Sequence, residues 1–208
     1  MFYRQKNSVV ICIFIFILLS LASNACFGSN LEEEYLLAGV ENAIQGRFKE
    51  AKMDFNKSLE VSNEPKLNNA NVYLQIIEDA INQKIKEETA TYIFKGMNHI
   101  SRWDVNEGMA ELDKAIFNEP EYKYGYFLRG INYATIILDH EKAIFDLKKV
   151  LELDPQFAFA YYNIAYEYKN IDNKTEAIKA FKNFIKYAPP EDEYFIKDAE
   201  EKIRELEK

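Results

Sequence analysis

Residues 142–155 read KAIFDLKKVLELDP, and three other stretches of the chain follow the same pattern. They are EGMAELDKAIFNEP at 107–120, EAIKAFKNFIKYAP at 176–189 and a looser copy, EAKMDFNKSLEVSN, at 50–63. The three closer copies end in proline, at Pro120, Pro155 and Pro189, and these prolines are 35 and 34 residues apart. An internal period of this size is typical of stacked structural repeats.

Each copy is preceded by a second recurring segment. These segments are YLLAGVENA (35–43), YIFKGMNHI (92–100), YFLRGINYA (126–134) and YYNIAYEYK (161–169). Each begins with tyrosine and has a small residue four positions later, which is the spacing of one helix face. The small residues, which would let a neighbouring helix approach closely, are Gly39, Gly96, Gly130 and Ala165. Each unit is therefore predicted to be two helices joined by a short turn, with proline ending the second.

These columns resemble the tetratricopeptide repeat, a helix-turn-helix unit of about 34 residues that stacks on its neighbours. The resemblance implies an all-α fold, a right-handed α-solenoid in which the first helix of each unit lines a concave surface. The units are expected at 32–65, 89–122, 123–157 and 158–191. The third unit has one extra residue, which we expect in its inter-helix turn near Ile137 and Leu138.

Two further segments have helical periodicity outside the repeat pattern. Residues 66–88 are predicted to form an extra helix with the apolar stripe Val72, Ile76, Ile77, Ala80, Ile81 and Ile85, which could disturb stacking after the first unit. Residues 192–208 are predicted to form a helix that caps the apolar end of the last unit, as solenoids require. Its apolar side would carry Phe195, Ala199, Ile203 and Leu206.

Residues 1–25 are expected to be a secretory signal peptide. MFYRQKN carries Arg4 and Lys6, the apolar run VVICIFIFILLSLA covers 9–22, and the small-residue stretch SNACFGSN follows. A run of 14 residues is shorter than the roughly 20 that a spanning helix needs, although a retained signal anchor is the alternative. We therefore expect the chain to be exported to the periplasm or cell envelope.

Cleavage before Cys26 would leave this cysteine at the new N-terminus, followed by a short tether at 26–31. The arrangement resembles bacterial lipoproteins, which acylate a cysteine at that position. Their motif usually has leucine three residues earlier, where Ser23 stands here. Ordinary cleavage after Ala25 or Gly28 remains the alternative, so lipidation of Cys26 is one of two expectations.

Charge and motif content limit the functional classes. The formal net charge of −8 becomes −10 without residues 1–25, which disfavours binding to nucleic acid or to anionic lipid. The sequence has no Gly-rich phosphate loop, no nucleophile elbow and no metal-ligand spacing of His or Cys on a shared face. We predict a non-catalytic protein without cofactor or metal.

The repeat positions that lie next to the recurring tyrosines and small residues predict a partner-binding groove. From the repeat at 123–157 onward these positions are almost wholly apolar or aromatic, which suits an amphipathic helix or an extended hydrophobic segment. Tetratricopeptide domains that clamp chaperone C-termini have Lys, Asn and Arg there, so that function is not expected. The candidate residues are Ile93, Met97, Tyr124, Phe127, Ile131, Phe159, Tyr162 and Tyr166.

Three occupants of this groove are open from the sequence: a protein or peptide partner, a covering helix or second copy of the chain, and a hydrophobic small ligand. Replacing Phe127 and Tyr162 with Glu is expected to abolish partner binding and to leave helicity intact. A loss of helicity would instead assign both residues to the core.

Overall fold

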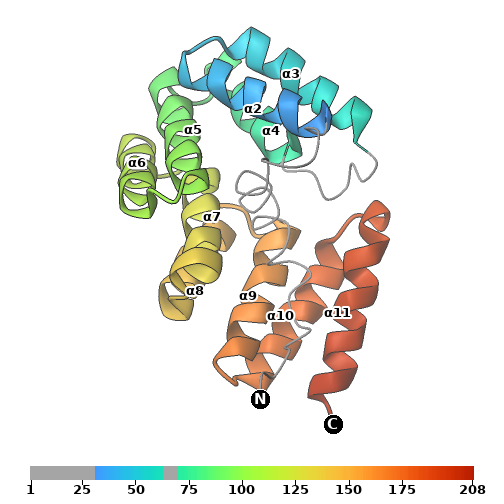
Figure 1. Cartoon of the computed structure of the whole chain (residues 1–208). Helices are drawn as coiled ribbons and strands as arrows, with labels where there is room; N and C mark the ends of the chain where they lie inside the picture. The colour runs from blue at the N-terminus through green and yellow to red at the C-terminus, as the bar shows by residue number, and fades with distance from the viewer. Residues whose placement is uncertain (1–30, 63–69) are drawn as a thin grey trace, which may run out of the picture. The chain divides into compact units, whose positions relative to one another are not determined.

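The computed structural model describes residues 31–62 and 70–208, and these residues form α-helices joined by short turns (Figure 1). No strand occurs within the described ranges, and the predicted all-α repeat fold is confirmed. The predictions for the signal peptide and for Cys26 fall outside these ranges. Contacts divide the described residues into two compact units, each of which holds more than one repeat. The first unit ends at Glu111 and the second begins at Leu112, so the division falls inside α6 (Val105–Asn118).

The first unit contains two helix pairs and the extra helix. Its helices before α6 are α2 (Leu31–Ile44), α3 (Phe48–Val61), α4 (Ala70–Ile81) and α5 (Glu87–Ser101). The extra helix α4 packs on α3 and α5, and α2 also contacts α5. The extra helix therefore does not separate the first helix pair from the next helix.

Three aromatic rings join α3, α4 and α5. The ring centroid of Tyr73 on α4 lies 5.5 Å from both Phe55 on α3 and Phe94 on α5, and these two lie 5.7 Å apart. The predicted stripe included Ile76 and Ile77, which are fully buried, but it missed Tyr73. Ile81 of the stripe is exposed, because α4 ends at this residue.

The second unit is a row of antiparallel helix pairs in sequence order. After the second half of α6 it contains α7 (Lys123–Asn132), a π turn (Tyr133–Ile137), α8 (His140–Leu153), α9 (Ala158–Asn170), α10 (Lys174–Tyr187) and α11 (Glu193–Leu206). Each helix from α7 to α11 contacts the next one along the chain. The last helix, α11, buries Phe195, Ala199 and Ile203, as expected for a cap.

The turn within each helix pair contains one residue with positive φ. These residues are Gly46 (φ 72°), Trp103 (66°), Leu138 (60°) and Asp172 (59°). In the first, second and fourth pairs, the backbone N–H of the residue after the positive-φ residue donates to the carbonyl oxygen five residues earlier, as Arg47 does to Asn42. In the third pair Asp139 donates to Tyr133, six residues earlier. The extra residue therefore lies in the π turn Tyr133–Ile137, which ends at the predicted position near Ile137 and Leu138 and leads into the inter-helix turn.

The small-residue positions are places where a neighbouring helix packs closely against the backbone of the small residue. A Cβ added at Gly108 of α6 would lie 2.7 Å from the carbonyl oxygen of Gly96 in α5. A Cβ at Gly130 of α7 would lie 3.1 Å from the Asp146 Cβ of α8. At Gly39 it would overlap the Phe55 ring. Close approach at these columns was predicted from the sequence and is present.

Candidate functional site

The candidate groove residues of the second unit lie on one side of α7 and one side of α9. On each helix they are spaced i, i+3, i+7, so they share a face. We call this set the aromatic face: Tyr124, Phe127 and Ile131 of α7 with Phe159, Tyr162 and Tyr166 of α9. Phe159 and Tyr166 are half-buried and the other four are buried.

The two helices are linked at the start of α9 by Phe157. Its ring centroid lies 5.0 Å from that of Phe127 and 5.8 Å from that of Tyr124, both edge to face. The Lys123 ammonium lies 4.8 Å from the Phe157 centroid and 5.1 Å from the Tyr124 centroid. The same ammonium pairs with Asp154 at 2.6 Å. The α7 part of the aromatic face is thus held by α9 and by the end of α8.

Tyr162 lies in the interior of the second unit. It has no exposed surface, and its ring centroid lies 4.8 Å from Phe184 of α10 and 5.5 Å from Phe195 of α11. A third ring, Phe181, lies at 6.0 Å. The expectation that Tyr162 can become Glu without loss of helicity does not fit this packing, because an unpaired buried carboxylate is strongly destabilising.

A carboxylate of α11 joins the tyrosines of α9. Tyr162 and Tyr166 each donate their hydroxyl to Asp198 Oδ2 at 2.6 Å. Burial, followed by the neighbouring tyrosine and the Asp198 hydrogen bond, raises the pKa of Tyr162 above its usual value. Burial and the Asp198 hydrogen bond also raise the pKa of Tyr166. Both phenols therefore remain protonated donors at physiological pH.

The candidate residues of the first unit are on α5. Ile93 is fully buried and Met97 is 8% exposed. Both lie in the helix that packs on α2 and α4. They belong to the interior of the first unit, and no contact of theirs with a ligand surface follows from the structure.

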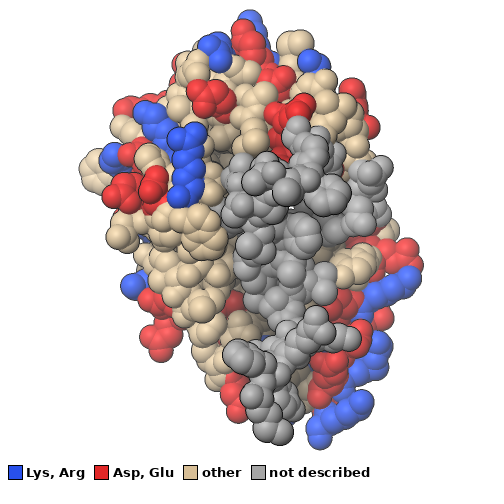
Figure 2. All heavy atoms as spheres, viewed as in Figure 1, with Lys and Arg blue, Asp and Glu red and all other residues tan. Residues whose placement is uncertain are grey.

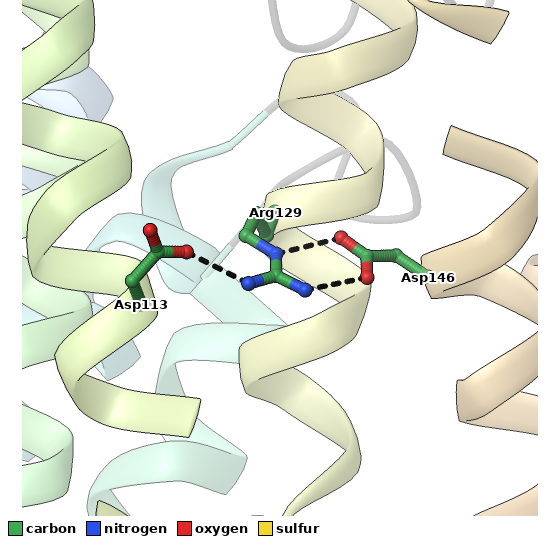
Figure 3. A network of polar contacts seen from close by, with 3 residues as sticks. All are labelled: Asp113, Arg129 and Asp146. Atoms are coloured by element: carbon green, nitrogen blue, oxygen red, sulfur yellow. Dashed lines mark hydrogen bonds and ion pairs between the residues drawn. The ribbon is translucent and has the colours of Figure 1, made fainter. Parts of the chain in front are cut away.

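An arginine with two carboxylates ties three helices of the second unit together (Figure 3). Arg129 of α7 donates twice to Asp146 of α8, each time at 2.7 Å, and once to Asp113 of α6, also at 2.7 Å. Burial acts to lower the pKa of Arg129, but the hydrogen bonds to the carboxylates outweigh it and the pKa is raised. Burial raises the pKa of Asp146, against the effect of Arg129. This network positions helices and has no group free to react.

A second polar contact joins α8 and α9. His140 Nδ1 lies 2.7 Å from Oε2 of Glu167, whose side chain is almost fully buried. Burial raises the pKa of Glu167, and the hydrogen bond with His140 opposes this rise. His140 is the first residue of α8, so this contact ties the start of α8 to α9.

The described ranges hold no group of three His, Cys, Asp or Glu side chains placed to bind a metal ion. Among the same residues no helix is both long and apolar enough to span a bilayer. On the face in view in Figure 2, basic side chains are interspersed with acidic ones. Aromatic rings with buried hydroxyls are the chemical groups that this site offers.

Sequence reasoning missed Arg129 and Asp198. Arg129 stands within the apolar stretch FLRGI, and a charge in such a stretch is a signal that could have been used. Asp198 was not included in the predicted buried side of the cap helix. Its position three residues after Phe195 places it on the buried face, and this spacing was the available signal.

The comparisons with known proteins agree with this fold. The family model of the tetratricopeptide repeat matches residues 139–157 and 160–191. The TPR2AB domain of yeast Sti1, solved in a complex with pHSP90, is 15% identical, with a TM-score of 0.54, over 91% of this chain and 75% of that one. TTC0263, a TPR protein of Thermus thermophilus, is 17% identical, with a TM-score of 0.51, over 83% and 98%. No curated protein sequence gives a significant match. The tetratricopeptide-repeat model thus matches the part of the chain that forms α8, α9 and α10, and the two solved structures share the helical repeat fold.

Proposed function

We propose that the chain is an exported, non-catalytic tetratricopeptide-repeat scaffold that binds a protein or peptide partner through its aromatic face and acts in assembly at the cell envelope. The observation that carries the proposal is the alignment of aromatic and apolar side chains on one side of α7 and α9. Repeat domains of this fold generally bind protein partners, and the similar structure from yeast Sti1 was solved in a complex with pHSP90.

The chemistry of the aromatic face favours an apolar partner. Burying one Phe-sized side chain is worth roughly 1.5–3 kcal/mol. Two or three such anchors offset the cost of association and give binding of about micromolar strength. Phe159 and Tyr166 are half-buried, so they retain the accessible surface that a partner would cover.

Export is supported by the sequence of residues 1–25, with its basic start, apolar run and small-residue exit. The site would then lie outside the cytoplasm. A lipid on Cys26 would hold the scaffold at a membrane surface through a short tether.

The test is capture of partners from envelope extract by the mature chain, residues 27–208. A Tyr166→Ala variant removes a half-buried ring of the aromatic face. A Phe145→Ala variant is the matched control, because Phe145 is an aromatic residue of α8 that is 69% exposed and outside this face. Circular dichroism is used to check that both variants keep their helix content.

We expect a protein that the parent and the Phe145→Ala variant capture and that the Tyr166→Ala variant loses. Equal capture by all three would contradict the proposal for this face. Lipid copurifying with the parent, without any captured protein, would favour the alternative function as a carrier of a hydrophobic ligand.

A further inference from the structure

The end of the aromatic face is covered by a helix of the chain itself. Figure 1 shows α9, α10 and α11 next to one another, and α11 contacts both α10 and, through Asp198, α9. The covering helix brings one aromatic ring to the face: Phe195 lies 5.2 Å from Phe159 and 5.5 Å from Tyr162, edge to face in both cases.

The covering helix also brings one charge. Asp198 follows Phe195 by three residues, so both side chains lie on the same side of α11. Its Oδ2 accepts both tyrosine hydroxyls at 2.6 Å. Hydrogen bonds to an ionised acceptor are roughly twice as strong as neutral ones, so the two phenols recognise a carboxylate specifically. An apolar side chain at this position would leave two hydroxyls without their acceptor.

The rest of the attachment of α11 is apolar or weak. Ala199 and Ile203 continue its buried stripe. The ion pair between Lys182 of α10 and Glu207, at 3.1 Å, joins two exposed side chains, and such pairs contribute little. An isolated helix of 14 residues is marginal in water, so α11 depends on this face for its order.

We propose that the aromatic face recognises amphipathic helices in which an aromatic residue is followed three positions later by a carboxylate, and that α11 is the chain's own occupant of the α9 part of the face. This inference rests on the proposed function and specifies its partner. A partner helix with the same pair of side chains competes with α11 for Tyr162 and Tyr166. The chain's own helix has the advantage of its tether, since short linkers give effective concentrations of about millimolar.

The probe is a fluorescent peptide of residues 190–208, titrated against the full mature chain and followed by anisotropy. The receptor is an Asp198→Ala chain, whose own α11 lacks the carboxylate. Two peptides are compared, one with the natural sequence and one with Asp198→Ala. A second receptor carries Tyr162→Phe and Tyr166→Phe as well, which keeps both rings and removes both hydroxyls.

We expect the natural peptide to bind the Asp198→Ala chain about tenfold or more tightly than the Asp198→Ala peptide does, because it restores the hydrogen bonds to a charged acceptor. On the second receptor the two peptides should bind equally. The unchanged chain should bind the natural peptide much more weakly, because its own helix occupies the face. An Asp198→Asn chain serves as receptor if the alanine variant does not fold.

The inference is overturned if the natural peptide does not bind a folded Asp198→Ala or Asp198→Asn chain, or if the preference for the carboxylate persists without the hydroxyls. If the peptide experiment fails in this way and a partner is still captured from envelope extract, the proposed scaffold function remains supported and only the inference about α11 is wrong. Peptide recognition without any captured partner would instead support this face and count against the scaffold function.

Discussion

The two carboxylates bound to Arg129 provide a test of how burial sets the strength of an ion pair. The side chain of Asp146 is 1% exposed and takes two hydrogen bonds, whereas that of Asp113 is 60% exposed and takes one. Both contacts measure 2.7 Å, so distance alone predicts equal contributions. Solvent screening predicts that they differ several-fold.

Asp146→Ala should lower the free energy of unfolding by about 3 kcal/mol or more, because it leaves a mostly buried guanidinium without its bidentate partner. Asp113→Ala should lower it by about 0–1 kcal/mol, the range of exposed pairs. Urea unfolding followed by circular dichroism measures both, and Asp113→Ala is the matched control, since it removes the same group from the same arginine. At high salt the small effect of Asp113→Ala should vanish, and that of Asp146→Ala should remain.

Equal losses of stability in the two variants would refute the reasoning, because burial would then have no influence on the strength of these contacts. A large loss of stability for Asp113→Ala alone would mean that the contact between Asp113 of α6 and Arg129 of α7 matters more than the burial of Asp146.

Three further outcomes are expected. Gly108→Ala should destabilise the chain by about 1–3 kcal/mol in urea unfolding despite the better helix propensity of alanine, since its Cβ would lie 2.7 Å from the Gly96 carbonyl oxygen; an unchanged midpoint would show that α5 and α6 can separate freely. The raised pKa of Glu167 means that the folded state binds its proton more tightly than the unfolded state, whose pKa is near 4.5. As pH rises above this value, the free energy of unfolding of the parent should therefore fall more than that of Glu167→Gln. If the free energy of unfolding changes with pH equally in both, the predicted direction is wrong. Mass spectrometry of the exported chain should find an acylated N-terminus at Cys26 that Cys26→Ser lacks, and an unmodified terminus after Ala25 or Gly28 would show ordinary cleavage.

The helices and their pairing could be predicted because they depend on short-range periodicity. The small residues at Gly39, Gly96 and Gly130 recur at a fixed distance from a tyrosine, and a neighbouring helix packs closely at each of them. Such columns report the packing within one repeat directly. The cap helix was predictable in the same way, from the spacing of Phe195, Ala199 and Ile203.

The features that could not be predicted depend on conformation or on distant partners. From the sequence, the extra residue of the third pair could lie in the inter-helix turn or at the end of the helix before it. The hydrogen bond from the Asp139 N–H to the Tyr133 carbonyl, six residues earlier, places it in the π turn. Tyr73 lies on the same face of α4 as Ile76 and Ile77, so periodicity could have found its burial, but its contacts with two rings on other helices could not be predicted. Arg129 and Asp198 each have a local signal of burial, but the partners that they bind lie on other helices and no local pattern identifies them.

The candidate site shows why a repeat protein is difficult to interpret from its columns. A helix that follows in the chain and a partner helix require the same chemistry from the face that they cover. Phe127 of α7 is met by Phe157 at the start of α9, and the equivalent Tyr162 of α9 is met by Phe195 of α11. An aromatic column therefore predicts that a helix will be bound and does not say whose helix it is. The answer depends on how firmly the chain's own helix is held. Because Asp198 supplies the charged contact between α11 and the tyrosines, this residue decides whether that end of the face is permanent core or an exchangeable site.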